Sequence, residues 1–369
     1  MKGIRMQTPR QYAPRRYRRL LAVGGVAAFL LAGCGGDDAP SSDSADDPVT
    51  GTVRTFTYDD SIEPTVLDPF EAAYPGVEVQ TATFNSNAQA AAKIKGGFGT
   101  DVIEVCLDES GPLVNGNLLA PIDTGKITDW NDMAPAFRNA EGVTIDGSTY
   151  LVPLSAGPHG LIYDKAAFPD GVSSWADLYD PAYAGRVALD GGQSLIPIAI
   201  TALALGYEDP LSITPDEITE VRDYMIENRA QFRTFADSDS DTINLFKSGE
   251  IVLTDGGLGT TTKLQNEGVD VGWVAPDEGA LSWVCGFGIS SESKNVAASY
   301  ALINHYLSAE MQAIIASQGF LITNPEAIPL IPAEERAAAD PSQLEAMIPE
   351  EEADYQDEFD QAWQEIQVG

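Results

Sequence analysis

The amino-acid sequence predicts an α/β protein with a mostly parallel sheet that is covered by helices on both faces. Short β-rich runs alternate with helical stretches from residue 53 onward, and a second alternating series begins near residue 150. Short connections in β-α-β-α-β order are typical of parallel sheets that are buried on both faces. The roughly 320 residues that follow the N-terminal segment are enough for two domains of ordinary size, each with its own core.

The first series holds three predicted strands and two predicted helices. The spacing of Val66, Leu67 and Phe70 is helical, and Pro75-Gly76 ends that helix. Asn85-Ser86-Asn87 offers capping side chains at the start of the second helix. The predicted strands are 53–58, 77–82 and 101–106, and the predicted helices are 62–74 and 85–94.

The second series starts with two extended segments, 151–154 and 160–164, which Ser155-Ala156-Gly157-Pro158 joins. Further strands are predicted at 186–190, 251–255, 269–274 and 287–289. Helices are predicted at 174–178, 195–205, 215–228, 297–307, 309–317 and 355–366, and one more opens near Thr260. Residues 326–369 read as an acidic C-terminal arm with a terminal helix.

Residues 1–33 have the layout of a secretory signal peptide. They hold seven basic residues and no acidic ones, and the apolar run 20–31 is too short to span a bilayer. The segment closes on Leu31-Ala32-Gly33-Cys34, which resembles a lipobox, where the cysteine takes a diacylglycerol and becomes the new N-terminus. The alternative is a cysteine that merely follows an apolar run. The paired arginines leave both the general secretory route and the twin-arginine route open.

A lipid on Cys34 predicts a lipoprotein on the outer, periplasmic or extracellular, face of the cytoplasmic membrane, which the lipid alone anchors. Residues 35–47 contain no large apolar side chain, so the stretch 34–51 is predicted to be a disordered acidic linker. Beyond the signal, no apolar run approaches the length of a membrane span.

The charge of the chain excludes several classes of partner. Removal of residues 1–33 would leave 14 Lys and Arg against 56 Asp and Glu, a net charge of −42. Such a surface repels the phosphates of nucleic acids and anionic lipid headgroups. An acidic surface of this kind suits either a high-salt habitat or an acidic exported proteome, and both interpretations stay open.

The residue types needed for metal, cofactor or nucleophilic chemistry are scarce. The histidines are His159 and His305, and the cysteines besides Cys34 are Cys106 and Cys285. There is no CxxC pair or His/Cys cluster for zinc, and no nucleophile-elbow, Walker or dinucleotide-binding motif in a supporting context. We therefore expect no cofactor, no metal and no enzymatic activity.

Three segments of the sequence carry a resemblance to a known protein family. The first is residues 174–186, which read SWADLYDPAYAGR. The second is Phe246-Lys247-Ser248-Gly249-Glu250-Ile251. The third runs from Trp283 through Gly288-Ile289 and Lys294-Asn295 to Asn324. These segments resemble extracellular solute-binding proteins of ATP-driven (ABC) importers, and most closely the spermidine/putrescine-binding family. Together with the first strand and helix, the resemblance covers most of residues 52–330.

The resemblance implies a two-lobed periplasmic-binding-protein-like fold of type II with the ligand cleft between the lobes. Lobe one would combine residues 52–152 with 286–325, and lobe two would be 158–280. The crossing segments would lie near Ser155-Gly157 and Ala280-Cys285, where small residues suit a hinge. The implied partners are a small-molecule ligand and a membrane permease, and the protein is expected to be a monomer.

The resemblance also implies a set of ligand contacts, in which this chain departs from the family. Members that bind polyamines surround the methylene chain with aromatic rings and hold the ammonium groups with acids. Here Trp283 is retained, while most of the aromatic cage is expected to be absent and carboxylates stand in several of those places. The implied ligand-binding residues are Tyr58, Asp59, Asp60, Asp108, Ala156, Gly192, Gln193, Gly257, Trp283 and Cys285.

The resemblance further places Cys106 and Cys285 near each other at the pocket floor, either as a disulfide or as two separate buried thiols. Polyamine binding, or binding of another amine-bearing solute, is the favoured function. One alternative is a zwitterionic or anionic solute, because Gly192-Gln193 and Gly259-Thr260 precede helices whose N-termini can bind anions. A secreted glycoside hydrolase that uses Asp59, Asp108 or Asp190 as paired carboxylates is a further alternative, and a sensor role in place of transport stays open.

Overall fold

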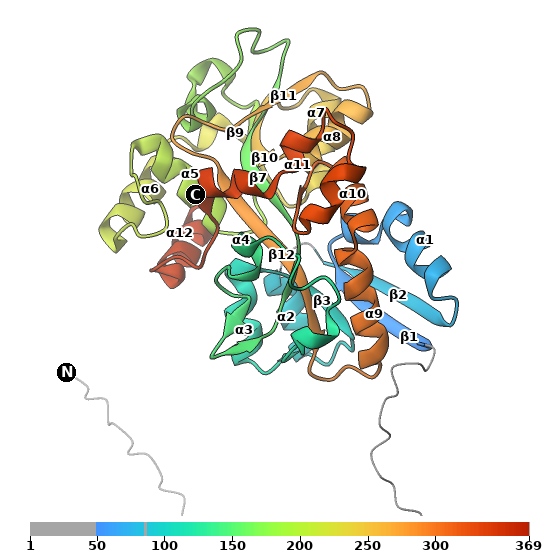
Figure 1. Ribbon diagram of the computed structural model, residues 1–369. Coiled ribbons are helices and arrows are strands. Elements are labelled where there is room, and N and C mark those ends of the chain that lie inside the picture. The colour runs from blue at the N-terminus through green and yellow to red at the C-terminus, as the bar shows by residue number, and fades with distance from the viewer. Residues whose placement is uncertain (1–48, 85–86, 369) are drawn as a thin grey trace, which may run out of the picture. The chain divides into compact units, whose positions relative to one another are not determined.

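The backbone of the computed structural model is organised around one large sheet (Figure 1). The structure describes residues 49–84 and 87–368, which belong to a single compact unit. The strand order along the sheet is β2-β1-β3-β12-β7-β10-β8-β9. In chain order these strands are β1 (Gly51–Thr57), β2 (Val77–Thr83), β3 (Val102–Cys106), β7 (Val152–Asp164), β8 (Val187–Asp190), β9 (Phe232–Ala236), β10 (Leu253–Gly257) and β12 (Leu281–Ser290).

The sheet is mixed, so the expectation of a mostly parallel sheet is wrong in this detail. Strand β1 pairs in parallel with β2 and β3, and β8 pairs in parallel with β9 and β10. The two long central strands, β7 and β12, instead pair antiparallel with each other and with β10 and β3. The β-α-β pattern therefore predicts the two flanks correctly, whereas the centre consists of two strands that run in opposite directions between them.

The predicted joint at residues 155–158 lies inside a continuous strand. β7 runs unbroken over 13 residues, and within it Gly157 and Pro158 face Trp283 and Ser282 of β12. The first half of β7 pairs with β12, and the second half pairs with β10 and β11 (Val271–Val274). Small residues here serve close strand packing, because a Cβ on Gly157 would lie 2.7 Å from Cζ2 of Trp283.

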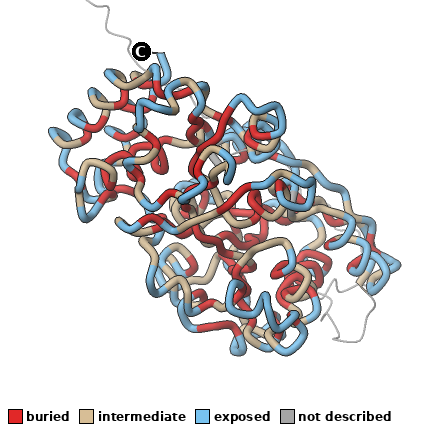
Figure 2. The backbone as a smooth tube through the Cα atoms, turned by 90° about the horizontal axis from the view of Figure 1, so that it is seen from above, coloured by how far each residue is buried: buried red, intermediate tan, exposed pale blue. Residues whose placement is uncertain are grey.

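Helices cover both flanks of the sheet, and each flank has its own large apolar cluster. Residues 195–205 and 309–317 form helices with the predicted bounds. The helices are α1 (Pro64–Ala73), α2 (Asn87–Lys95), α3 (Ser110–Asn115), α4 (Pro135–Arg138), α5 (Leu195–Leu205), α6 (Pro215–Glu227), α7 (Asp239–Ser248), α8 (Leu258–Asn266), α9 (Val296–Leu307), α10 (Ala309–Ser317), α11 (Arg336–Ala339) and α12 (Gln356–Val368). Figure 2 shows the buried stretches in the interior and exposed residues on the outer turns.

The C-terminal residues contact elements of both flanks. Ala327, Ile331 and Ala339 pack with apolar residues around α10. The chain then forms β14 (Ile348–Pro349), which pairs with β12, and ends in α12, which packs against α5 and α6. The side chains of α12 at positions 359, 362, 363 and 366 are buried with the core around α5.

The N-terminal predictions lie outside the described residues. These are the signal peptide, Cys34 and the linker up to residue 48. At the end of the predicted linker, Gly51 is already the first residue of β1. None of the helices formed by residues 49–84 and 87–368 combines the length and apolar character that crossing a bilayer requires.

Candidate functional site

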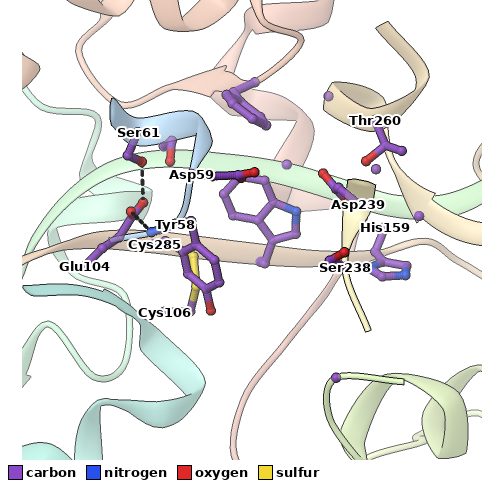
Figure 3. A pocket seen from close by; sticks show the side chains of 18 of the residues that line it. Tyr58, Asp59, Ser61, Glu104, Cys106, His159, Ser238, Asp239, Thr260 and Cys285 are labelled. Carbon is purple, nitrogen blue, oxygen red and sulfur yellow. Dashed lines mark hydrogen bonds between the residues drawn. A yellow bond between two sulfur atoms is a disulfide. The ribbon is translucent and has the colours of Figure 1, made fainter. Parts of the chain in front are cut away.

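A cavity of about 300 Å³ lies where the two flanks of the sheet meet. It is lined by the segments that follow β1, β3, β8, β9 and β10, by residues of the central strands, and by one residue of the C-terminal segment. Figure 3 shows Tyr58, Asp59 and Glu104 towards one end, and His159, Ser238, Asp239 and Thr260 towards the other. This volume suits a small organic molecule.

The first end of the cavity is built on the turn that follows β1. Glu104 of β3 fixes this turn, because its two carboxylate oxygens accept hydrogen bonds from the backbone N–H of Tyr58 (3.0 Å) and from Oγ of Ser61 (2.9 Å). Asp59 is thereby held exposed at the cavity wall. Burial, followed by the charges of nearby carboxylates, raises the pKa of Tyr58, so its ring stays neutral.

Six aromatic residues line the cavity, and the expectation that most of the family's aromatic cage is absent stays a prediction. The ring centroids of Tyr58 and Phe84 lie 4.7 Å apart, and those of Trp283 and Phe320 lie 5.5 Å apart. Gly259 permits the second pair, since a Cβ there would come within 2.7 Å of the Phe320 ring. The six are Tyr58, Phe84, Trp283, Phe287, Tyr306 and Phe320.

Cys106 and Cys285 form a disulfide that lies in the cavity wall (Figure 3). They are direct register partners on β3 and β12, which explains how residues 179 positions apart in the sequence come together. The bond joins the parallel flank that begins with β1 to the central strands. It therefore gives the cavity a covalently fixed floor.

The second end of the cavity centres on His159. Its Nε2 lies 2.9 Å from Oδ2 of Asp255, and its Nδ1 lies 3.9 Å from Oε1 of Glu350. Burial alone would lower the pKa of His159, but the hydrogen bond to Asp255 and the surrounding carboxylates raise it to about 9. Burial also raises the pKa of Asp190 to about 6 and that of Glu350 to about 7.

Most of the residues predicted as ligand contacts do line this cavity: Tyr58, Asp59, Asp108, Gly192, Gln193, Gly257, Trp283 and Cys285. Ala156 does not, because it is fully buried in the apolar cluster beneath β7. Asp60 begins the short 3-10 helix η1 (Asp60–Ile62), next to Asp59. Burial, Glu109 and Glu350 raise the pKa of Asp108.

Sequence reasoning missed several lining residues. Among them are Phe84, Glu104, His159, Asp255, Phe320 and Glu350. Phe84 directly follows β2, and Asp255 lies near the end of β10, so the rule that ligands contact the ends of strands could have found both. Glu350 lies in the C-terminal arm, for which the sequence offers no such signal.

The cavity is strongly acidic. Among the described residues that line it there is no Lys or Arg, and His159 is the only basic side chain. Its carboxylates are Asp59, Glu104, Asp108, Glu109, Asp190, Asp237, Asp239, Asp255 and Glu350. Two helix N-termini also reach the cavity, those of α7 and α8, but Asp239 and Asp241 occupy the first turn of α7. The charge of this wall favours a cation over an anion.

A family model of bacterial extracellular solute-binding proteins matches residues 65–344. The chain is a bacterial extracellular solute-binding protein.

Curated relatives of this solute-binding protein align over most of their length. The spermidine/putrescine-binding periplasmic protein 1 of Haemophilus influenzae is 26% identical over 329 residues, which is 87% of this chain and 88% of the relative. The putrescine-binding periplasmic protein PotF of Escherichia coli is 25% identical over 303 residues, which is 77% of this chain and 81% of the relative. Both relatives are binding proteins, and their names place them in the periplasm.

Solved structures establish the fold of the solute-binding protein. A putative spermidine/putrescine ABC transporter from Listeria monocytogenes superposes with a TM-score of 0.76 at 22% identity, covering 86% of this chain and 99% of the other. The binding protein MotA of A. tumefaciens, solved with glucopine, gives 0.73 at 18% identity and covers 86% and 100%. The fold is therefore the two-lobed type II fold of periplasmic binding proteins.

Proposed function

We propose that this solute-binding protein captures a small organic solute through an ammonium group and delivers it to a membrane permease. One observation carries the proposal: nine carboxylates and no Lys or Arg line the cavity, within the part of the chain that the structure describes. The aromatic faces of Tyr58 and Trp283 add to this, because an ammonium group is attracted to such rings. The names of the curated relatives, which are spermidine- or putrescine-binding proteins, support the same class of ligand.

In the proposed mechanism, two lobes close on the solute. We assign 52–152 with 286–325 to lobe one and 158–280 to lobe two. The chain crosses between them along the paired strands β7 and β12. A solute that contacts both lobes binds the closed form better than the open form and shifts the population towards it. The permease then recognises the closed surface, and the solute is released chemically unchanged.

We expect Asp59→Asn and Asp108→Asn each to weaken binding of the amine by about 1–3 kcal/mol, because a charge-assisted contact becomes a neutral one. The amine is first found by a thermal-shift screen over polyamines, amino acids, betaines, organophosphonates and sugars, since a bound ligand raises the melting temperature. Isothermal titration with the amine that binds most tightly then measures the affinity of each variant for it.

The matched control is Asp209→Asn, which removes a charge from an exposed loop residue outside the cavity lining. If the ligand is an anion instead, both cavity variants will leave its affinity unchanged or improve it. Thr260→Pro and Gly192→Val, at the segments that open α8 and precede α5, would then weaken binding more. The proposal is contradicted if the ligand that binds most tightly carries no amine and the four variants change its affinity in this way.

We also propose that Cys34 carries a lipid that holds the protein, as a monomer, on the outer face of the cytoplasmic membrane. The residues before Cys34 support this proposal. We expect Cys34→Ser to move the protein from the membrane fraction to the soluble or secreted fraction, with unchanged ligand affinity. Continued membrane association of that variant, measured by fractionation and immunoblotting, would contradict the anchor.

A further inference from the structure

His159 is a basic side chain set between two buried acids in the wall of an otherwise acidic cavity. Its Nε2 lies 2.9 Å from Asp255 and its Nδ1 lies 3.9 Å from Glu350. The side chains of the three are 12%, 0% and 4% exposed, respectively. They come from β7, from β10 and from the segment after β14, so the whole fold is needed to assemble them.

These contacts keep the imidazole charged. The titratable groups that face it are Asp255, Glu350 and Asp190, which lie on different elements, and all three favour the protonated ring. Because the pKa of His159 is raised to about 9, the ring is an imidazolium at neutral pH. It is thus a cation that belongs to the protein and is present before any ligand arrives.

We propose that His159 takes the place of a ligand ammonium group at this end of the cavity, so that the protein selects solutes with one ammonium group over diamines. The inference rests on the proposed amine-binding function and narrows its ligand class. An ammonium group placed here would lie beside the imidazolium in a buried site, where like charges repel strongly.

The hydrogen bonds of Asp255 and Asp190, two of the three acids that face His159, support this role. Oδ2 of Asp255 is occupied by His159, and Oδ1 accepts the backbone N–H of Asp190 at 2.9 Å. Oδ1 of Asp190 in turn accepts the backbone N–H of Gly192 at 2.8 Å. Asp237 and Asp239, also in the lining, are exposed, so solvent and salt screen their charges.

The opposite end of the cavity lacks such an internal cation. Asp59 and Glu104 lie there beside Tyr58, with no Lys, Arg or His among the lining residues labelled at that end. A single ammonium group is therefore best placed at this end, against carboxylates and an aromatic ring. The remainder of the solute then extends towards His159, where an uncharged hydrogen-bonding group is tolerated better than a second ammonium.

The test compares putrescine with 4-amino-1-butanol, which has the same chain length but one ammonium group and one hydroxyl. By isothermal titration at neutral pH, we expect the wild-type protein to bind 4-amino-1-butanol at least as tightly as putrescine. His159→Gln should shift the ratio of the two affinities towards putrescine by about tenfold or more. The control is His305→Gln, which replaces the chain's other histidine, beside Phe70 and outside the cavity lining, and should leave the ratio unchanged.

A wild-type protein that binds putrescine more than about tenfold tighter overturns the inference, as does a folded His159→Gln variant with an unchanged ratio. A second measurement needs no variant and no ligand: NMR titration of the two imidazole rings, where His159 should titrate near pH 9. If neither these two amines nor any other amine of the thermal-shift screen binds, the proposed function fails. The NMR titration then tests only whether His159 is charged at neutral pH. A pKa of His159 at or below the ordinary value for histidine overturns the inference.

Discussion

Removal of the disulfide between Cys106 and Cys285 is expected to lower the free energy of unfolding by about 4–5 kcal/mol. The bond closes a loop between residues 179 positions apart, and so long a loop strongly restricts the unfolded chain. The measurement is urea unfolding of the Cys106→Ser/Cys285→Ser double variant, with Cys34→Ser as the common background. We also expect weaker ligand binding, because both sulfur atoms belong to the cavity wall.

Thiol counting provides the direct check on the bond itself. Denatured, unreduced protein of the Cys34→Ser form should react with no thiol reagent, because the sequence has three cysteines and the bond occupies the other two. After reduction, two thiols should appear. Two reactive thiols before reduction would contradict the bridge, and equal unfolding midpoints for reduced and oxidised protein would contradict its energetic role.

The second large effect is expected from Phe359→Ala on α12, which should cost about 3–5 kcal/mol of stability. Phe359 is fully buried and packs with the core around α5, together with Trp363 and Ile366. The cavity left by the ring would be lined by apolar side chains, so water could not compensate for the lost contacts. Chemical denaturation of the wild-type protein and of the variant, followed by the same spectroscopic signal, measures the difference in the free energy of unfolding.

The matched control is Gln364→Ala, which lies on the exposed face of the same helix and should change stability little. If Phe359→Ala is no less stable than this control, then α12 does not complete the core around α5. Phe359→Ala should also weaken ligand binding, because α12 follows the segment that carries Glu350 into the cavity wall.

Local patterns predicted the elements of the fold well, but not how they pair. The apolar run at 195–205 and the amphipathic run at 215–228 are helices in the structure, because their burial follows from their own spacing. The sequence predicts that residues 155–158 join two separate extended segments, because small residues suit a hinge. Their extended conformation is instead fixed by β12, more than 100 residues later, and no local pattern reveals such pairing.

The site could be predicted to a similar extent. Tyr58, Asp59 and Asp108 follow strands and resemble family contacts, so the sequence indicates them. His159 and Glu350 could not be recognised, because neither is unusual in its own segment. Their significance arises only when β14 pairs with β12 and brings the C-terminal segment to β7.

The packing of α12 against the core around α5 has a consequence for biosynthesis. The core around α5 includes Trp175 and Val221 together with Phe359 and Ile366, so it cannot close until α12 has left the ribosome. The strands β1, β2 and β3 of one flank can begin to pair early, whereas the core of the other flank must wait for α12. Contacts of such long sequence separation slow folding. The core around α5 is therefore expected to form late in folding.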